Sequence, residues 1–269
     1  MSKRIFTFLF CCFVVITFAA VVSCEKNSRS DDSKIVIGVS PVPHEEIIRA
    51  LKSDFEAEGI DVEVRVFDDY VQPNLALSSG DLDANFFQHT PYLESFCQER
   101  NLKLVSIGAV HIEPIALYSK KIQSISELKE GDEILIPNDA TNGGRALLLL
   151  QKAGLITLKD PTDIHATEAD IIENKLKLKF TALDAANIAN VYGDVAGGVI
   201  NTNFALSAGL SPKDAIIRED KDSPYANIVA VRAGEEGKEK FTKLMKVLHS
   251  DKCKDFIIKT YNSAIYPAF

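Results

Sequence analysis

The chain has 269 residues, of which 46% are hydrophobic and 25% are charged, a balance typical of an ordinary globular protein. Its 38 acidic residues outnumber its 30 basic ones, which gives a formal net charge of −8. This acidic balance argues against a nucleic-acid-binding protein, because such proteins need a basic face to neutralise phosphates. Five cysteines are too few to form the framework of a disulfide-rich domain. We therefore expect one large or two modest globular domains.

The first 24 residues have the pattern of a targeting signal. Lys3 and Arg4 precede an uncharged, mostly apolar stretch over residues 5–22. A basic start followed by an apolar segment is typical of a secretory signal. The stretch ends at Ser23 and Cys24, and this end resembles a bacterial lipobox, in which the cysteine is lipidated and becomes the first residue of the mature chain.

We predict a signal peptide over residues 1–23, lipidation at Cys24 and a flexible tether over residues 24–33, a segment rich in polar residues. The alternative is an uncleaved anchor, because a mostly apolar stretch of about 18 residues is nearly long enough to span a bilayer. Both interpretations hold the globular part outside the cytoplasm, at a membrane.

The globular part begins with alternating strand and helix patterns. In chain order the predicted elements are a strand at 35–39, a helix from 43 to 59, a strand at 62–67, a helix at 74–79 and a strand at 82–87. A strand–helix–strand order of this kind implies a parallel sheet with right-handed crossovers.

The same strand–helix–strand pattern recurs later in the chain. A strand is predicted at 133–137, a helix at 143–153 and a further strand that ends at 199–201. The pattern therefore indicates two similar α/β lobes. The final stretch, residues 235–261, is helical and amphipathic, and it either closes the first lobe or links the two.

One candidate binding segment lies between the strand at 133–137 and the helix after it, where residues 139–145 read DATNGGR. A helix start offers free backbone N–H groups and partial positive charge, so it can seat an anion. Glycines allow close approach of the backbone, and Arg145 in the first turn could hold a carboxylate with two hydrogen bonds. The alternative is a capped helix with a solvated arginine.

A second candidate segment gathers aromatic residues at the end of a strand, where residues 85–92 read NFFQHTPY. Ligands of open α/β sheets bind at the carboxyl ends of the strands. Phe86 and Phe87 point to opposite faces of that strand, so one is expected in the core and the other in a cleft. Tyr70, at the end of the preceding strand, is the natural neighbour. His111 closes another strand, which crosses between the lobes.

The remaining polar residues suit binding rather than catalysis. His89 and His111 lie on separate elements without a third metal ligand, so no metal site is predicted. His44 is placed at a helix start and given no function. Asn201, Asn203 and Asn227 follow strands or turns, where an amide can accept from an ammonium and donate to a carboxylate. No nucleophile with a partner base is visible, so no catalytic residue is assigned.

Five segments then show a family resemblance. They are residues 67–93, 110–119, 136–155, 199–210 and 223–232, and in this order they resemble the NlpA-type methionine-binding lipoproteins. The resemblance spans nearly all of residues 34–269. Phe86 and Phe204 depart from the residues that are usual in the family.

The resemblance implies an α/β, two-lobed periplasmic-binding-protein fold (type II-like) with a ligand cleft between the lobes. One lobe would comprise residues 34–113 plus 228–269, and the other residues 114–227. Such a protein closes on L-methionine and delivers it to an ABC permease and its ATPase. The expected protein is a monomer without a cofactor, lipid-anchored to a bacterial membrane and facing the periplasm.

The same resemblance implies residue roles. Arg145 would hold the ligand α-carboxylate with Asn142 close by, and Asn201 and Asn227 would fix the head group. The residues that would wall the side-chain pocket are Tyr70, Phe86, Phe87, His89 and His111.

Three alternatives stay open. The ligand could be D-methionine or another small apolar amino acid instead. The scaffold could carry an enzyme, for which His89 and His111 are the candidate pair. The chain could also be a surface-exposed lipoprotein that acts as an antigen or adhesin.

Overall fold

Two mixed β-sheets organise residues 33–269, the part of the chain that the computed structural model describes. The predicted signal peptide, Cys24 and most of the tether lie outside these residues. In spatial order the first sheet holds β13 (Tyr266–Pro267), β4 (Leu104–Ile112), β12 (Ala226–Arg232), β3 (Ala84–His89), β1 (Lys34–Val39) and β2 (Asp61–Val66). The second sheet holds β11 (Ala215–Arg218), β5 (Ala116–Tyr118), β10 (Gly197–Ile200), β6 (Glu133–Pro137) and β9 (Lys179–Leu183). A small third sheet pairs β7 (Thr157–Leu158) with β8 (Ile171–Glu173).

The strand–helix–strand prediction is confirmed in both lobes. In the first sheet β1 pairs in parallel with β2 and with β3, and in the second sheet β6 pairs in parallel with β9 and β10. Antiparallel strands complete each sheet, since β12 runs against both β3 and β4, and β5 runs against β10 and β11. The sheets are therefore mixed, which the parallel segments alone did not predict.

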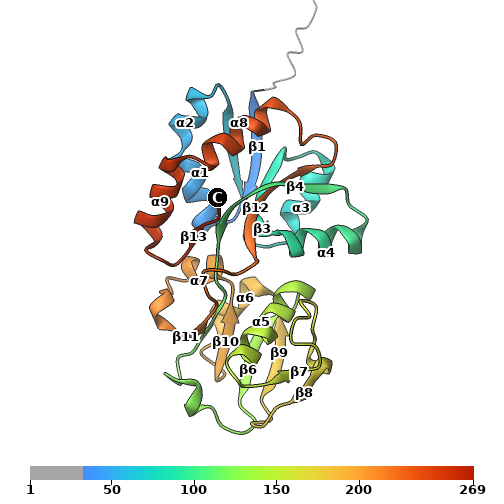
Figure 1. The fold of residues 1–269 in the computed structure, drawn as a ribbon, viewed down its shortest axis with the longest axis vertical. Helices are drawn as coiled ribbons and strands as arrows, with labels where there is room; N and C mark the ends of the chain where they lie inside the picture. The colour runs from blue at the N-terminus through green and yellow to red at the C-terminus, as the bar shows by residue number, and fades with distance from the viewer. Residues whose placement is uncertain (1–32) are drawn as a thin grey trace, which may run out of the picture. The chain divides into compact units, whose positions relative to one another are not determined.

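Helices cover both faces of the first sheet (Figure 1). One face packs against α1 (Glu46–Ala50), α2 (Lys52–Ala57), α8 (Glu239–Leu248) and α9 (Asp251–Tyr261), and the other against α3 (Gln72–Ser79) and α4 (Thr90–Arg100). Phe241 and Leu244 of α8 are buried in the same cluster as Ile35 and Ile37 of β1. The C-terminal helices thus close the first lobe, which was one of the two predicted possibilities.

The predicted helix over 43–59 is interrupted. An irregular turn over Pro41–Glu45, in which Val42 is extended at φ −130° and ψ 133°, leads into α1, and Leu51, with φ −101° and ψ 7°, separates α1 from α2. The side chain of Leu51 is fully buried in the core of the first lobe. The amphipathic period is kept across the break, so the apolar pattern could not reveal it.

The second sheet is covered by α5 (Ala140–Lys152) on one face and by α6 (Ala185–Val191) and α7 (Thr202–Ser207) on the other. Helix α5 starts three residues before the predicted Gly143, because the Asp139 carboxylate caps it by accepting from the Asn142 N–H at 2.8 Å. Gly144 lies inside the helix, where an added Cβ would come 2.3 Å from the Ile164 carbonyl oxygen. This glycine therefore admits a neighbouring loop and not a ligand.

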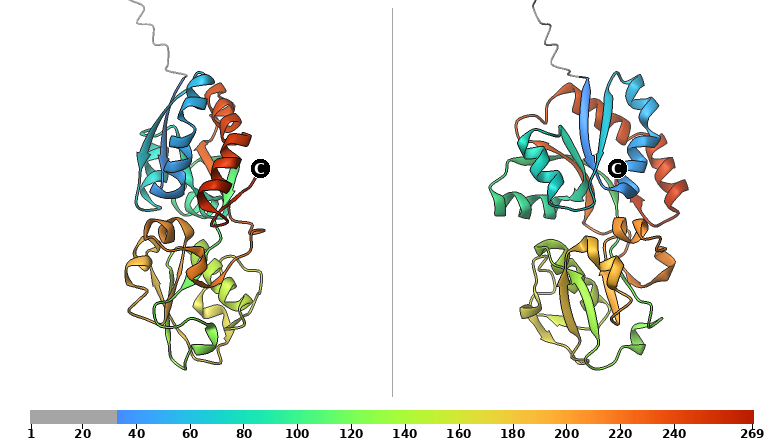
Figure 2. Two further views of the ribbon diagram at one scale, coloured as in Figure 1. Left: turned by 90° about the vertical axis from the view of Figure 1, so that its left-hand side faces the viewer. Right: turned by 180° about the vertical axis from the view of Figure 1, so that it is seen from behind.

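The chain passes between the sheets twice, from β4 to β5 and from β11 to β12 (Figure 2). The two-lobed α/β fold class is confirmed. Asn227 pairs with His89 and His111 and so belongs to the first sheet. Our lobe boundary between residues 227 and 228, which falls just inside β12, stays a prediction. Over residues 33–269 no helix is both long enough and apolar enough to cross a bilayer.

Candidate ligand-binding site

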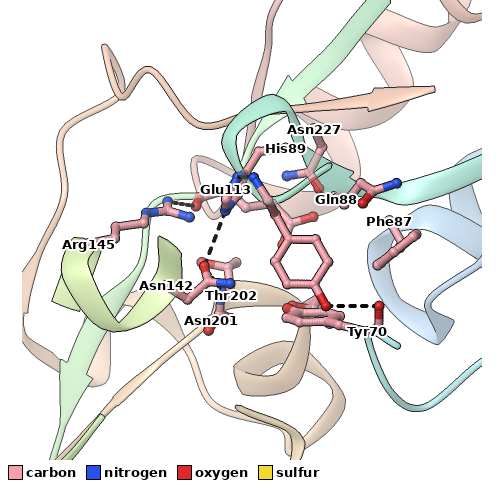
Figure 3. A pocket seen from close by; sticks show the side chains of 12 residues that line it. Tyr70, Phe87, Gln88, His89, Glu113, Asn142, Arg145, Asn201, Thr202 and Asn227 are labelled. Carbon is pink, nitrogen blue, oxygen red and sulfur yellow. Dashed lines mark hydrogen bonds between the residues drawn. The ribbon is translucent and has the colours of Figure 1, made fainter. Parts of the chain in front are cut away.

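A cavity of about 320 Å³, counted with the space open to solvent at its mouth, lies among side chains from both lobes. It is bordered by the ends of β3 and β10, where the Gln88–His89 and Asn201 side chains project (Figure 3). The lining residues are Tyr70, Phe87, Gln88, His89, Tyr92, Glu113, Asn142, Arg145, Asn201, Thr202, Asn203 and Asn227.

Most of the residues predicted from the sequence meet at this cavity. Those that line it are Tyr70, Phe87, His89, Asn142, Arg145, Asn201 and Asn227. Phe86 and His111 do not, because both are fully buried behind the wall, with ring centroids 5.3 Å apart. The two neighbouring phenylalanines divide as their alternation on a strand predicts, Phe86 in the core and Phe87 at the cavity.

Aromatic rings form one side of the cavity. The Tyr70 ring lies 5.8 Å from that of Phe87, 5.7 Å from that of Tyr92 and 4.9 Å from that of Phe204, measured between centroids. The Tyr70 hydroxyl donates to Asn203 Oδ1 at 2.5 Å, and so joins the first lobe to α7 of the second. Burial raises the pKa of Tyr70 well above its ordinary value, so the phenol keeps its proton and donates.

Arg145 lies on the opposite side, and its surroundings correct the prediction. It stands in the second turn of α5 and not in the first, and only 2% of its surface is exposed, so it is not a solvated arginine. Its Nε and Nη2 donate to the two carboxylate oxygens of Glu219 at 2.8 and 2.5 Å, and Nη2 also donates to the Glu113 carbonyl oxygen at 2.7 Å. The hydrogen bonds among the described residues leave Nη1 unused. The helix start itself is taken by Asp139.

A chain of hydrogen bonds fixes which way the amides face. His89 Nδ1 accepts from the Tyr92 N–H, so its proton is on Nε2, which donates to Asn142 Oδ1 at 3.2 Å. Burial, and then the charge of Arg145, lower the pKa of His89 to about 3, so the ring is neutral. The same Asn142 oxygen accepts from Asn201 Nδ2 at 2.9 Å.

Two amide atoms at the cavity have no hydrogen-bond partner among residues 33–269. They are Asn201 Oδ1, an acceptor, and Asn203 Nδ2, a donor, and both are buried. A buried polar atom without a partner is costly, so each favours a ligand group of the opposite kind. An acceptor and a donor at the same cavity match the ammonium and carboxylate of an amino acid.

Some cavity residues were not assigned to the site from the sequence. Gln88 and Tyr92 stand within the aromatic segment at 85–92, and Thr202 directly follows Asn201, so their position gave a signal. Glu113 directly follows β4 at the crossing between the sheets. Glu219, which neutralises Arg145 from 74 residues away, had no local signal.

His89 and His111, the candidate pair of the enzyme alternative, have different partners. His111 instead lies with His44 and Glu113, and the ligating atoms of these three buried residues are all within 4.8 Å of one another. His44 is fully buried and its Nε2 contacts Asn227 Oδ1 at 3.2 Å, so it is more than a residue at a helix start.

Comparison with known proteins gives consistent matches. The sequence model of a family described as NlpA lipoprotein matches residues 35–269. The D-methionine-binding lipoprotein MetQ of Salmonella typhi is 44% identical over 247 residues, which cover 90% of this chain and 91% of that protein. The methionine-binding lipoprotein MetQ of Bacillus subtilis is 40% identical, with 94% and 96% covered.

A solved structure agrees with these sequence matches. A nutrient-binding protein from Burkholderia cenocepacia, bound to methionine, superposes with a TM-score of 0.84 at 47% identity, and the match covers 87% of this chain and all of that one. The named relatives are binding proteins and none is an enzyme, which confirms the prediction that this chain is not an enzyme.

Proposed function

Because the chain belongs to the NlpA lipoprotein family, we propose that it is a membrane-tethered substrate-binding protein that captures L-methionine by lobe closure and delivers it to an ABC importer. One observation carries the proposal. The cavity has aromatic rings on one side, a guanidinium on the other and two unpartnered amide atoms in its wall, and these residues come from both lobes. This arrangement suits a small zwitterion with an apolar side chain.

The aromatic side supports a thioether ligand in particular. Sulfur packs favourably against ring edges at about 5 Å, and an unbranched side chain fits a narrow slot between rings. Tyr70, Phe87 and Tyr92 offer such edges. The names of the relatives, which bind methionine or D-methionine, point the same way.

Contacts that cross between the lobes support the proposed lobe closure. Tyr70 of the first lobe bonds Asn203 of the second, and His89 of the first bonds Asn142 of the second. A ligand between these pairs touches both lobes only when they are closed, so its binding shifts the equilibrium toward the closed state.

Titration calorimetry of the purified protein, freed of bound ligand by unfolding and refolding, tests the ligand. We expect L-methionine to bind more tightly than D-methionine, and both to bind more tightly than leucine. Mass spectrometry of the small molecule released when freshly purified protein is denatured should identify methionine. Release of another compound, together with no heat from either methionine isomer, would refute the proposal.

The tether and the anchor form a separate part of the proposal. We infer that Cys24 is lipidated after cleavage of residues 1–23, and that residues 24–33 hold a monomeric receptor at the periplasmic face. In a bacterial host, the Cys24→Ser variant should leave the membrane fraction while its methionine affinity is unchanged. Sedimentation of that variant should give the mass of one chain. A variant that stays in the membrane fraction would contradict lipidation as the means of attachment.

A further inference from the structure

Behind the cavity lies a buried cluster formed by Glu113, His44 and His111. His111 Nε2 lies 2.7 Å from Glu113 Oε1, and His44 Nε2 lies 3.3 Å from the same oxygen. Both imidazoles are fully buried, and Glu113 is 5% exposed. Glu113 also lines the cavity, as Figure 3 shows, so its carboxylate connects the cluster to the ligand space.

The positions of the protons follow from the hydrogen bonds. The Nδ1 atoms of His44 and His111 have no partner among the described residues. If either Nδ1 carried the proton, a buried N–H would lack an acceptor, which costs more than a bare acceptor nitrogen. The protons are therefore on Nε2, where His111 donates to Glu113 Oε1 at 2.7 Å and His44 donates to Asn227 Oδ1 at 3.2 Å, with Glu113 Oε1 beside it at 3.3 Å.

The same reasoning disfavours a metal ion between these three residues. A metal would need both Nε2 atoms unprotonated, and a metal-bound histidine almost always donates its other N–H to a partner. Here both Nδ1–H groups would lack one. The cluster is better described as a carboxylate held by one neutral donor, His111, with the neutral His44 ring beside it.

The charges around the cavity leave Glu113 without full compensation. Arg145 is engaged by both oxygens of Glu219, so one cation faces two carboxylates. Burial lowers the pKa of His44 to about 4 and that of His111 to about 3, so neither supplies a positive charge near neutral pH. Burial also raises the pKa of Glu113, the direction expected for a carboxylate that lacks a full counter-charge.

We propose that Glu113 is the counter-ion of the ligand's ammonium group and that His111 is a positioning residue that holds its carboxylate. The inference rests on the proposed function and deepens it, because it defines the ligand class by a free amine. The carboxylate accepts from His111 and from the Asn203 backbone N–H, two donors for about four lone-pair sites, while the His44 N–H is engaged by Asn227. Sites therefore remain for the ligand.

The proposal ranks two analogues of methionine. Methioninamide keeps the ammonium and lacks the carboxylate, whereas 4-(methylthio)butanoate keeps the carboxylate and lacks the ammonium. A cavity whose uncompensated charge is negative binds the first more tightly. We expect the affinity ratio to be on the order of 100-fold, the scale for losing one member of a buried charge pair.

Calorimetry on the wild-type protein and on Glu113→Gln tests this directly. The variant keeps the shape of the side chain, and we expect it to lose methionine and methioninamide affinity on the order of 100-fold. Its affinity for 4-(methylthio)butanoate should not fall, so the ratio should collapse. Wild-type protein that prefers 4-(methylthio)butanoate would overturn the proposal without needing any variant, and so would an unchanged ratio in Glu113→Gln.

The positioning role has its own test. His111→Leu removes a donor to Glu113, and His111→Gln retains one. A general loss of structure weakens the binding of both analogues alike, whereas loss of positioning lowers their ratio. We expect a lowered ratio in His111→Leu and a largely restored one in His111→Gln, and equal ratios in the two variants would overturn this role. Absence of methionine binding by the wild-type protein would overturn the proposed function and this inference with it.

Discussion

Arg145 shows at the scale of one residue how a buried charge is stabilised. Its guanidinium is held by Glu219 and lies 4.3 Å from the Tyr225 ring centroid. Arg145→Ala would leave Glu219 without its cation. Breaking a buried ion pair costs about 3–5 kcal/mol, so the free energy of unfolding should fall by that amount. Methionine affinity should fall as well, because the Nη1 donor is lost. Urea denaturation and calorimetry measure the two effects.

Lys152 provides a matched control on the same helix. It forms an ion pair with Asp220, and both side chains are exposed. Such a pair contributes little because solvent screens it. Lys152→Ala should change neither stability nor affinity measurably. If Lys152→Ala lost as much stability and affinity as Arg145→Ala, the burial of the Arg145–Glu219 ion pair would not be the cause of the effects seen in Arg145→Ala.

Phe86 and Phe87 are adjacent residues with separate roles. Phe86 is fully buried in the first core, so Phe86→Ala should lower the free energy of unfolding by about 3–5 kcal/mol. Phe87 lines the cavity, so Phe87→Ala should mainly weaken methionine binding through lost apolar contact. Denaturation curves and calorimetry on both variants compare the effects. If Phe86→Ala mainly weakened binding and Phe87→Ala mainly lowered stability, the pocket would lie on the other face of β3.

At the scale of the element, the start of α5 joins helix capping to ligand recognition. Asp139 accepts from the Asn142 backbone N–H, and both its carboxylate oxygens accept from Asn142 Nδ2. Asparagine caps a helix about as well as aspartate, so Asp139→Asn should change stability by less than about 1 kcal/mol. The amide introduced at position 139 has only one acceptor oxygen, so it cannot accept from the Asn142 side chain with two atoms as the carboxylate does. Asn142 should therefore reorient and lose its hydrogen bonds to His89 and Asn201.

Calorimetry should therefore find methionine binding about tenfold weaker in Asp139→Asn. A tenfold change in affinity corresponds to about 1.4 kcal/mol, which is the scale of one lost hydrogen bond. Thr167, which caps a short helical turn elsewhere in the second lobe, offers a control through Thr167→Ser. That variant keeps its hydroxyl and should bind as the wild type does. Unchanged affinity in Asp139→Asn would show that the orientation of Asn142 is not needed.

At the scale of the whole molecule, three buried histidines make stability depend on pH. Burial lowers the pKa of His44 to about 4, and that of His89 and His111 to about 3. The unfolded chain binds these protons near pH 6.5 and the folded chain does not. Stability is therefore full above pH 6.5 and falls as the pH drops toward 4, by about 1.4 kcal/mol per pH unit for each histidine.

Glu113 and Asp139 have the opposite effect on how stability depends on pH. Burial raises the pKa of both, so the folded chain binds their protons at a higher pH than the unfolded chain does. A comparison with His89→Gln isolates one histidine from this background. We expect the free energy of unfolding of the variant, measured between pH 4.5 and 7, to fall less steeply with acid than that of the wild type. Parallel curves would contradict the assignment of a neutral buried ring to His89.

The sequence by itself determined the repeated units and the family. Strand and helix patterns are local consequences of where apolar residues recur, so both parallel segments and the helices at the C-terminus could be predicted, and the resemblance to the NlpA lipoproteins is confirmed. Tyr70, Phe87 and Asn201 could be predicted at the site because they lie near the carboxyl ends of strands, where such sheets form a cleft.

Only the tertiary structure decided how the charges are paired. Glu219 neutralises Arg145 across 74 positions, and His44 meets His111 and Glu113 across 67 and 69 positions, as the numbering shows. Burial removes water from these groups, so each must find its partner within the fold, and that partner depends on how distant strands are stacked. A periodic pattern records which face of an element is buried, but it carries no information about which distant side chain the buried face will meet.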